Sequence, residues 1–132
     1  MTKDIIEKAT EFSRDFEVSG FADNMDELLL KAVDFLHEEL EETKVAIAAS
    51  DRPEIIDGFG DVAFIALNGI YKEFRVNGES HEQATSRVHE VMNRICDANL
   101  GKRQADGTVK RVNGKVQKPE GWCPPAYDDM VA

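Results

Sequence analysis

Carboxylates recur at spacings of three and four residues in two consecutive stretches of the chain. Glu38, Glu39 and Glu42 form an EExxE pattern, and Asp57 and Asp61 follow further along. Residues three or four apart share one surface of an α-helix, so each set can present its oxygens in one direction. Carboxylates held together repel one another unless a cation or a proton lies between them, and all-oxygen clusters suit Mg²⁺. The pattern indicates a divalent metal site, although runs of glutamate are also typical of solvated helix faces.

Among these acids, Asp61 is the one whose position is least well explained by exposure on a solvated helix face. Glu54 and Asp57 occupy the start of the same expected helix, where the positive helix terminus favours acidic residues. Asp61 lies further in and leads directly into the apolar stretch 62–67. An unpaired carboxylate buried at such a place is strongly destabilising. We therefore expect a compensating group, such as a cation, close to Asp61.

Two glycines lie within this acidic stretch. Gly58 and Gly60 each weaken a helix by about 1 kcal/mol relative to alanine, so their presence predicts that another helix or a ligand approaches closely. The two acid-bearing helices are joined by a short link, A-S-D-R-P at 49–53, which suits antiparallel neighbours. In that arrangement all of the acids can face one another: Glu38, Glu39, Glu42, Asp57 and Asp61.

Apolar residues at helical spacing predict four helices, over about residues 4–17, 25–49, 52–75 and 80–97. The third is apolar nearly all round from 62 to 70, which places it centrally in the fold. A thin four-helix monomer could hardly cover such a helix, so we expect a homodimer or a homotetramer. The second helix carries a main apolar stripe of Leu29, Val33, Leu36, Leu40 and Ile47.

Capping residues mark the starts of three of these helices. Asn24 can cap the second helix, and Asp51 followed by Pro53 suits the start of the third. Ser80 followed by Gln83 resembles a capping box at the start of the fourth. The local signals therefore agree with the helical periodicity.

The composition changes beyond the fourth helix. Residues 101–118 hold six lysines or arginines and one acid, within a chain whose formal net charge is −10. The turn signal Asn113-Gly114 predicts a small β-hairpin. We therefore expect an all-α bundle of four to five helices over residues 1–100. An irregular C-terminal extension over residues 101–132 is expected to pack on the same domain or on a partner subunit.

Overall composition excludes several classes of protein. A chain of 132 residues with 42% hydrophobic content suits one compact domain. Its negative charge disfavours binding to nucleic acid polymers or to anionic membranes, and no apolar run reaches the length of a membrane span. The N-terminus lacks a signal-peptide pattern. Cys96 and Cys123 have no metal-ligand spacing and are expected to be reduced thiols, so we predict a cytoplasmic protein.

The acidic patterns resemble those of the all-α NTP pyrophosphatases, which include MazG-like and phosphoribosyl-ATP pyrophosphohydrolase-like proteins. The resemblance depends on E-E-L-E-E at 38–42 and D-G-F-G-D at 57–61, placed before an apolar helix. The tail is similar to the C-terminal extension of a MazG-like subgroup found in phages and bacteria. The matching tail segments are V-H-E-V-M-N-R-I-C-D-A-N-L-G-K, D-G-T-V, G-K-V-Q-K-P-E-G-W and P-P.

This resemblance implies a hydrolase, dependent on Mg²⁺ or Mn²⁺, that cleaves a nucleoside triphosphate between its α and β phosphates to give the monophosphate and pyrophosphate. Such a reaction needs an aligned water more than a protein nucleophile, and one glutamate of the set, for which we take Glu39, can orient or deprotonate that water. Many relatives have a glutamate where this chain has Gly58, and Asp57 is here the nearest acid that can supply the missing oxygen. The implied metal-binding acids are Glu38, Glu39, Glu42 and Asp61. The implied nucleotide-binding residues are Asn99 and Lys102, which match an NxxK element, and Lys118.

Two other functions stay open at the level of sequence. One is hydrolysis of a related phosphoribosyl nucleotide such as phosphoribosyl-ATP. The other is a non-enzymatic acidic helical module whose carboxylates bind Ca²⁺ or a basic partner. Asp61 favours an enzyme, because an interaction module has no need for a carboxylate inside its most apolar helix.

Overall fold

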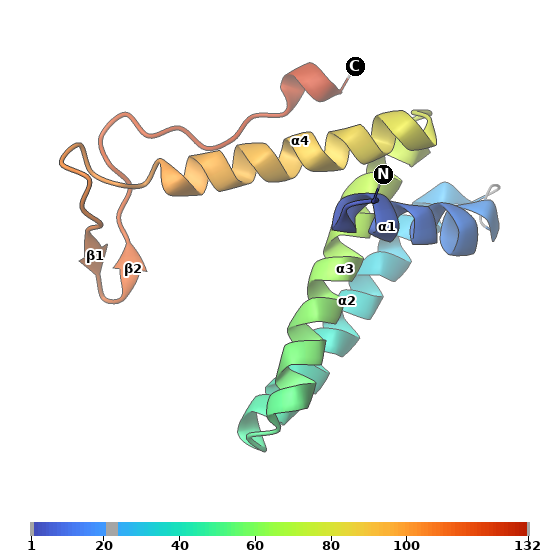
Figure 1. Cartoon of the computed structure of the whole chain (residues 1–132), viewed down its shortest axis with the longest axis horizontal. Coiled ribbons are helices and arrows are strands. Elements are labelled where there is room, and N and C mark those ends of the chain that lie inside the picture. The colour runs from blue at the N-terminus through green and yellow to red at the C-terminus, as the bar shows by residue number, and fades with distance from the viewer. Residues whose placement is uncertain (1, 21–23, 132) are drawn as a thin grey trace. The chain divides into compact units, whose positions relative to one another are not determined.

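The computed structural model describes residues 2–20 and 24–131 and is dominated by helices, as Figure 1 shows. None of the helices in this described part is both long and apolar enough to cross a membrane. The four predicted helical stretches are present at nearly the predicted positions. Their bounds are α1 (Ile5–Phe12), α2 (Met25–Ala48), α3 (Arg52–Val76) and α4 (His81–Leu100).

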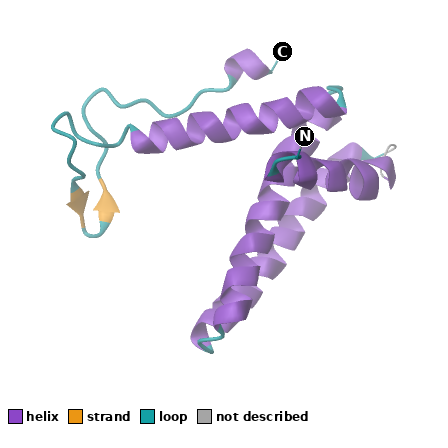
Figure 2. Cartoon of the chain, in the orientation of Figure 1, coloured by secondary structure: helices purple, strands orange, loops and turns teal. Residues whose placement is uncertain are grey.

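Shorter elements complete the chain. A π-helical turn, Ser13–Glu17, and a 3₁₀ turn, Val18–Gly20, continue α1, and a second 3₁₀ turn spans Asp128–Met130. Strands β1 (Arg111–Val112) and β2 (Lys115–Val116) pair antiparallel around Asn113 and Gly114, which both have positive φ. Figure 2 shows how small this sheet is beside the helices. The predicted all-α class with a short hairpin is confirmed.

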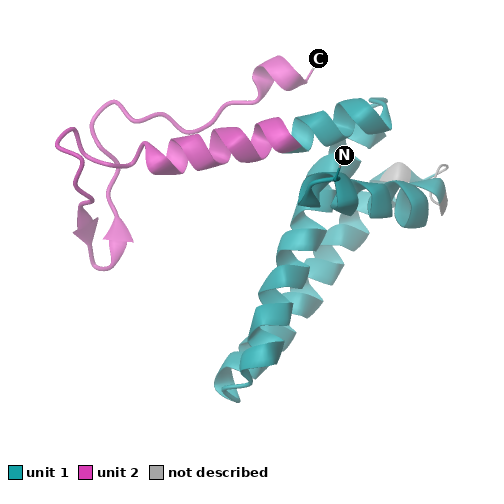
Figure 3. Cartoon of the chain, viewed as in Figure 1, with its two compact units in different colours: residues 1–88 teal, residues 89–132 magenta. Residues whose placement is uncertain are grey.

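The chain divides into two compact units, coloured separately in Figure 3. The first is Met1–Val88 and the second is His89–Ala132. The division falls inside α4, whereas the sequence suggested a change at the end of that helix. Each unit is described below by itself.

Capping side chains begin the helices as the sequence predicted. Asn24 and Asp51 each accept a hydrogen bond from a backbone amide in the first turn of α2 and α3. Ser80 and Gln83 exchange side-chain to backbone hydrogen bonds of 3.1 and 2.9 Å at the start of α4. These bonds satisfy amides that have no partner inside the helix, which explains why local sequence sets the helix starts.

In the first unit, α2 and α3 run side by side as an antiparallel pair (Figure 1). The inward side of α2 is formed by Leu28, Ala32, Thr43 and Ala46, all of which are buried. Small side chains at this contact allow the two helix axes to come close together. Apart from Leu28, the buried residues named on this side of α2 are therefore small.

The predicted apolar stripe of α2 is not the buried side of the helix within one chain. Val33, Leu40 and Ile47 are 49%, 45% and 51% exposed. On α3, Asn68 is buried, but the apolar residues between 62 and 70 remain partly or fully exposed. The apolar periodicity therefore marks a hydrophobic surface, and much of that surface is exposed to solvent in the single chain.

A buried ion pair fixes the end of α3 in the first unit. Lys72 is 2% exposed, and its Nζ donates a hydrogen bond of 2.7 Å to the Glu17 carboxylate on the π-helical turn. Thr85 on α4 donates a hydrogen bond of 3.0 Å to Thr10 on α1. Buried polar groups of this kind are tolerated because they are paired.

In the second unit, the C-terminal segment is tied to α4 by an arginine. The Arg94 guanidinium donates hydrogen bonds of 2.7 and 2.8 Å to the two carboxylate oxygens of Asp129, and one of 2.7 Å to the Ala126 carbonyl. Bidentate pairs of this type are among the stronger protein hydrogen bonds. Cys96 and Cys123 both lie in this unit as exposed, free thiols, as the sequence predicted.

Candidate functional site

The predicted metal ligands come from the two helices of the antiparallel pair. Glu38, Glu39 and Glu42 lie on α2, and Asp57 and Asp61 lie on α3. Glu39 and Asp61 are partly buried, whereas the other three acids are exposed. Each helix thus contributes one acid that is more buried as a residue than the other three.

Gly58 lets α2 and α3 approach each other beside these acids. A methyl group built at Gly58 would overlap the Thr43 hydroxyl and lie 3.2 Å from the Thr43 Cβ. The Thr43 hydroxyl itself donates a hydrogen bond of 2.6 Å to the Glu39 carbonyl, so it is held in place. The expectation of a close approach therefore applies at Gly58, where the neighbour is a helix. At Gly60 the chain itself provides no such neighbour, since nothing beyond the adjoining residues and the backbone of α3 lies within 4 Å of such a methyl group.

The electrostatics of Glu39 show that both helices contribute to one acidic cluster. Burial raises the pKa of the Glu39 carboxyl above its usual value, and the neighbouring negative charges raise it further. These charges belong, in decreasing order of effect, to Glu42, Asp61, Asp57 and Glu38. A proton or a cation close to Glu39 would therefore stabilise the cluster.

The donor chemistry of this cluster fits a hard divalent cation. All of its members are carboxylates, which Mg²⁺ and Mn²⁺ prefer over nitrogen or sulfur ligands. Across residues 2–20 and 24–131, no three His, Cys, Asp or Glu side chains already converge closely enough to enclose an ion. The other four carboxylates do lie within electrostatic range of Glu39.

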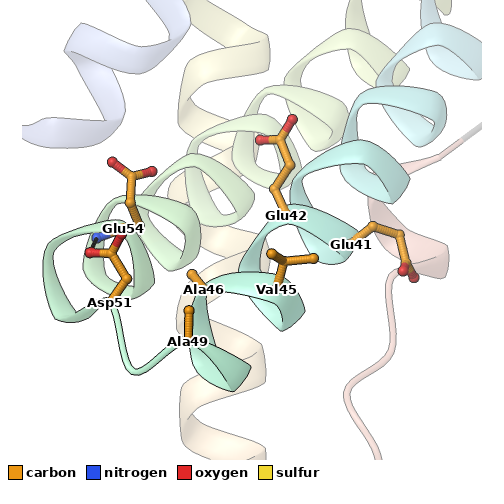
Figure 4. Close-up of a pocket in the computed structure, with 7 residues that line it drawn as sticks. All are labelled: Glu41, Glu42, Val45, Ala46, Ala49, Asp51 and Glu54. Carbon is orange, nitrogen blue, oxygen red and sulfur yellow. Dashed lines mark hydrogen bonds between the residues drawn. The ribbon is translucent and has the colours of Figure 1, made fainter.

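A shallow hollow lies beside the cluster, near the turn that joins α2 to α3. Its volume is about 390 Å³. Val45, Ala46 and Ala49 give it an apolar surface, and acids stand around them, including Glu42 (Figure 4). The other acids lining it are Glu41, Asp51 and Glu54. An apolar surface edged by hydrogen-bond acceptors suits a flat, partly polar group such as a nucleobase.

The three predicted nucleotide-binding residues gather in the second unit around Trp122. The Lys102 ammonium donates a hydrogen bond of 2.8 Å to the Asn99 side-chain oxygen and lies 5.4 Å from the centroid of the Trp122 ring. The Lys118 ammonium lies 4.8 Å from the same centroid. The chain thus brings together cationic groups that are separated by a hairpin in sequence.

Two residues of these arrangements were not identified from the sequence. Thr43 sits on α2 opposite Gly58, and its small size was the available signal, because close helix contacts favour small residues. Trp122 is the single tryptophan of the chain and lies in the P-E-G-W-C-P-P segment. A single aromatic residue flanked by prolines indicates that the segment packs against another part of the protein, but it does not identify that part.

Comparison with known proteins gives no relative from which to transfer a function. No family model, no curated protein and no solved structure matches the chain.

Proposed function

We propose that this protein is a Mg²⁺-dependent nucleoside triphosphate pyrophosphohydrolase of the MazG-like kind. The observation that supports this most strongly is that the negative charges of acids on both α2 and α3 add to burial in raising the pKa of the Glu39 carboxyl. A Mg²⁺ ion held there would supply positive charge to neutralise the phosphate oxygens of a nucleotide. The residues that would hold the ion are Glu38, Glu39, Glu42, Asp57 and Asp61.

The side chains of the protein have separate tasks in this reaction. Glu39 orients a water molecule and accepts its proton as the water oxygen bonds to the α-phosphorus. The bond between the α-phosphorus and the bridging oxygen to the β-phosphate breaks, and pyrophosphate leaves with the electron pair. By the resemblance, nucleotide binding through charge and hydrogen bonds falls to Asn99, Lys102 and Lys118 of the second unit, which would serve the site of their own chain or that of a neighbouring subunit. Phosphoryl transfer depends mainly on positioning and charge neutralisation, so no protein nucleophile is required.

The hollow beside Glu42 offers a place for the base or sugar of the nucleotide. Val45 and Ala46 provide apolar contact area, and the surrounding carboxylates can accept hydrogen bonds from base amino or imino groups. Binding energy from this non-reacting part of the substrate helps to position the α-phosphorus. The hollow therefore adds a recognition element next to the acidic cluster.

The product of nucleotide hydrolysis tests the proposed reaction directly. Incubation of the protein with each ribo- and deoxyribonucleoside triphosphate and Mg²⁺ should yield pyrophosphate and no orthophosphate. In water enriched in ¹⁸O, the label should appear in the monophosphate, because the attack is at the α-phosphorus. Chelation of the metal with EDTA should abolish turnover, and added Mg²⁺ or Mn²⁺ should restore it.

Other outcomes of this assay point to the other functions. Turnover of phosphoribosyl-ATP alone would assign the protein to that related reaction. Turnover that continues unchanged in EDTA would contradict a metal-dependent mechanism. If a folded, metal-supplied protein hydrolyses no nucleotide, the acidic cluster belongs to an interaction module.

The uncovered apolar surface of α2 supports self-association. Val33, Leu40 and Ile47 are each about half exposed, and Ile56 and Phe59 on α3 are 70% and 58% exposed. A second copy of the same chain would cover this surface in a larger shared bundle. We expect sedimentation equilibrium to give two or four times the chain mass of 14.8 kDa. A monomer at micromolar concentration would contradict the predicted homodimer or homotetramer.

A further inference from the structure

Trp122 is anchored to the C-terminal end of α4 within the second unit. Its indole Nε1 donates a hydrogen bond of 2.7 Å to the Ala98 carbonyl. This carbonyl lies in the last turn of the helix, where carbonyls lack a partner inside the helix. The indole also lies beside Gly101, since a methyl group there would be 3.9 Å from the Trp122 ring, an ordinary contact distance. The indole is thus held by a specific hydrogen bond, and it is only partly buried.

The side chains of two lysines lie close to the ring of this indole. The ammonium groups of Lys102 and Lys118 lie 5.4 and 4.8 Å from the ring centroid, within the range of cation–π attraction. Lys118 is exposed and Lys102 is partly buried, so water and solutes can reach both. Among the described residues, neither lysine forms an ion pair with a carboxylate. The two ammonium groups therefore lie near the same indole ring, and within the described part of the chain neither of them is paired with a carboxylate.

The hydrogen-bonding capacity of these lysines is largely unused. Each ammonium group has three donor hydrogens, and Lys102 uses one of them on Asn99. The negative end of the α4 dipole favours a nearby cation, which accounts for one lysine at this place. The helix dipole does not account for the second lysine, Lys118, which follows the β-hairpin in sequence and lies near the same ring. An anion with several charged oxygens would accept hydrogen bonds from both.

We propose that Trp122 is a positioning residue that holds Lys102 and Lys118 together as a two-lysine binding site for a polyphosphate. The site belongs to the second unit and requires no metal ion. The choice of polyphosphate over other anions rests on the proposed function, in which a triphosphate is the substrate. The cation–π contacts fix the lysines in place before the anion arrives, which reduces the entropic cost of binding.

The single tryptophan makes this site directly observable. The full-length protein is titrated with inorganic tripolyphosphate in EDTA, and Trp122 fluorescence is followed. A parallel titration with sodium sulfate at matched ionic strength controls for unspecific effects of salt. We expect a saturable change with tripolyphosphate and a much weaker response to sulfate. A response that is absent, or the same for both salts, would overturn the proposal.

Lysine variants distinguish a defined site from general electrostatic attraction. Lys102→Ala and Lys118→Ala should each weaken tripolyphosphate binding about tenfold, the usual effect of losing a charge-assisted hydrogen bond. The matched control is Lys110→Ala, which removes an equal charge from the same basic extension but lies away from the indole contacts. Equal weakening by all three substitutions would show that only the net charge matters, and would overturn the proposal.

Trp122→Phe tests the positioning role itself. Phenylalanine keeps an aromatic ring but loses the hydrogen bond to Ala98 and part of the cation–π attraction. Binding, measured by calorimetry for this variant, should weaken, and Trp122→Ala should weaken it further. Unchanged binding in a folded Trp122→Ala variant would overturn the positioning role. If either variant unfolds by circular dichroism, the lysine variants decide the proposal.

The tripolyphosphate titration and the nucleotide assay can fail separately. Asp61→Asn should bind tripolyphosphate in EDTA as tightly as the unmodified protein, because that acid lies outside the second unit. Polyphosphate binding without nucleotide hydrolysis would retain this site and reject the proposed enzyme. Nucleotide hydrolysis without metal-free binding would retain the enzyme and reject this site.

Discussion

Substitution of Asp61 by asparagine should reduce kcat for nucleoside triphosphate hydrolysis by about a thousandfold or more, equivalent to roughly 4 kcal/mol of transition-state stabilisation. Asparagine preserves the shape of the side chain but removes the negative charge that attracts a divalent cation. Asp61 is partly buried on α3 and contributes to the acidic field at Glu39. The measurement is steady-state kinetics with saturating Mg²⁺, with helical content checked by circular dichroism.

An acid outside both the cluster and the hollow provides the control for Asp61. Asp34 is an exposed residue on α2 that belongs neither to the predicted metal ligands nor to the lining of the hollow. Asp34→Asn removes the same charge from the chain and should leave kcat unchanged. Full activity in Asp61→Asn would remove this carboxylate from the mechanism. If Asp61→Asn lost its helical content, Asp61 would instead be a structural residue.

Substitution of Gly58 by alanine should lower the free energy of unfolding by about 2 kcal/mol, as expected for overpacking a close contact. The added methyl group would meet Thr43, which is 5% exposed and whose hydroxyl is bound to the Glu39 carbonyl. Thr43 cannot turn away without losing that hydrogen bond, so α2 and α3 must separate. Urea denaturation followed by circular dichroism measures the change. Because both helices carry the acidic cluster, hydrolysis should fall as well.

Gly60 provides a matched control on the same helix. A methyl group at Gly60 meets nothing within 4 Å beyond the adjoining residues and the backbone of α3, so Gly60→Ala should stabilise the protein by up to about 1 kcal/mol through better helix propensity. Thr43→Ala, combined with Gly58→Ala, should recover part of the lost stability, since it removes the atoms that clash. Equal losses from the two glycine substitutions would contradict a specific contact between Gly58 and Thr43.

The sequence by itself determined the local structure of this protein. Asn24, Asp51 and Ser80 begin helices because their side chains satisfy amides within a few residues of themselves. The Asn113-Gly114 pair forms the hairpin turn because these residues tolerate positive φ. Helical spacing and one short link also predicted that acids of both helices act on one another, and, in addition to burial, the charges of Glu42, Asp61, Asp57 and Glu38 do raise the pKa of Glu39.

Tertiary structure alone decided which surfaces meet. Periodicity marked Val33 and Leu40 as apolar, but packing of α2 on α3 turned Thr43 inward and left those residues exposed in a single chain. Likewise, no local signal distinguishes Gly58 from Gly60, and none predicts that Lys118 returns to Trp122. Caps and turns depend on neighbours in sequence, whereas these contacts join residues far apart in the chain. Their selection depends on the shapes of both partners, which one segment of sequence does not contain.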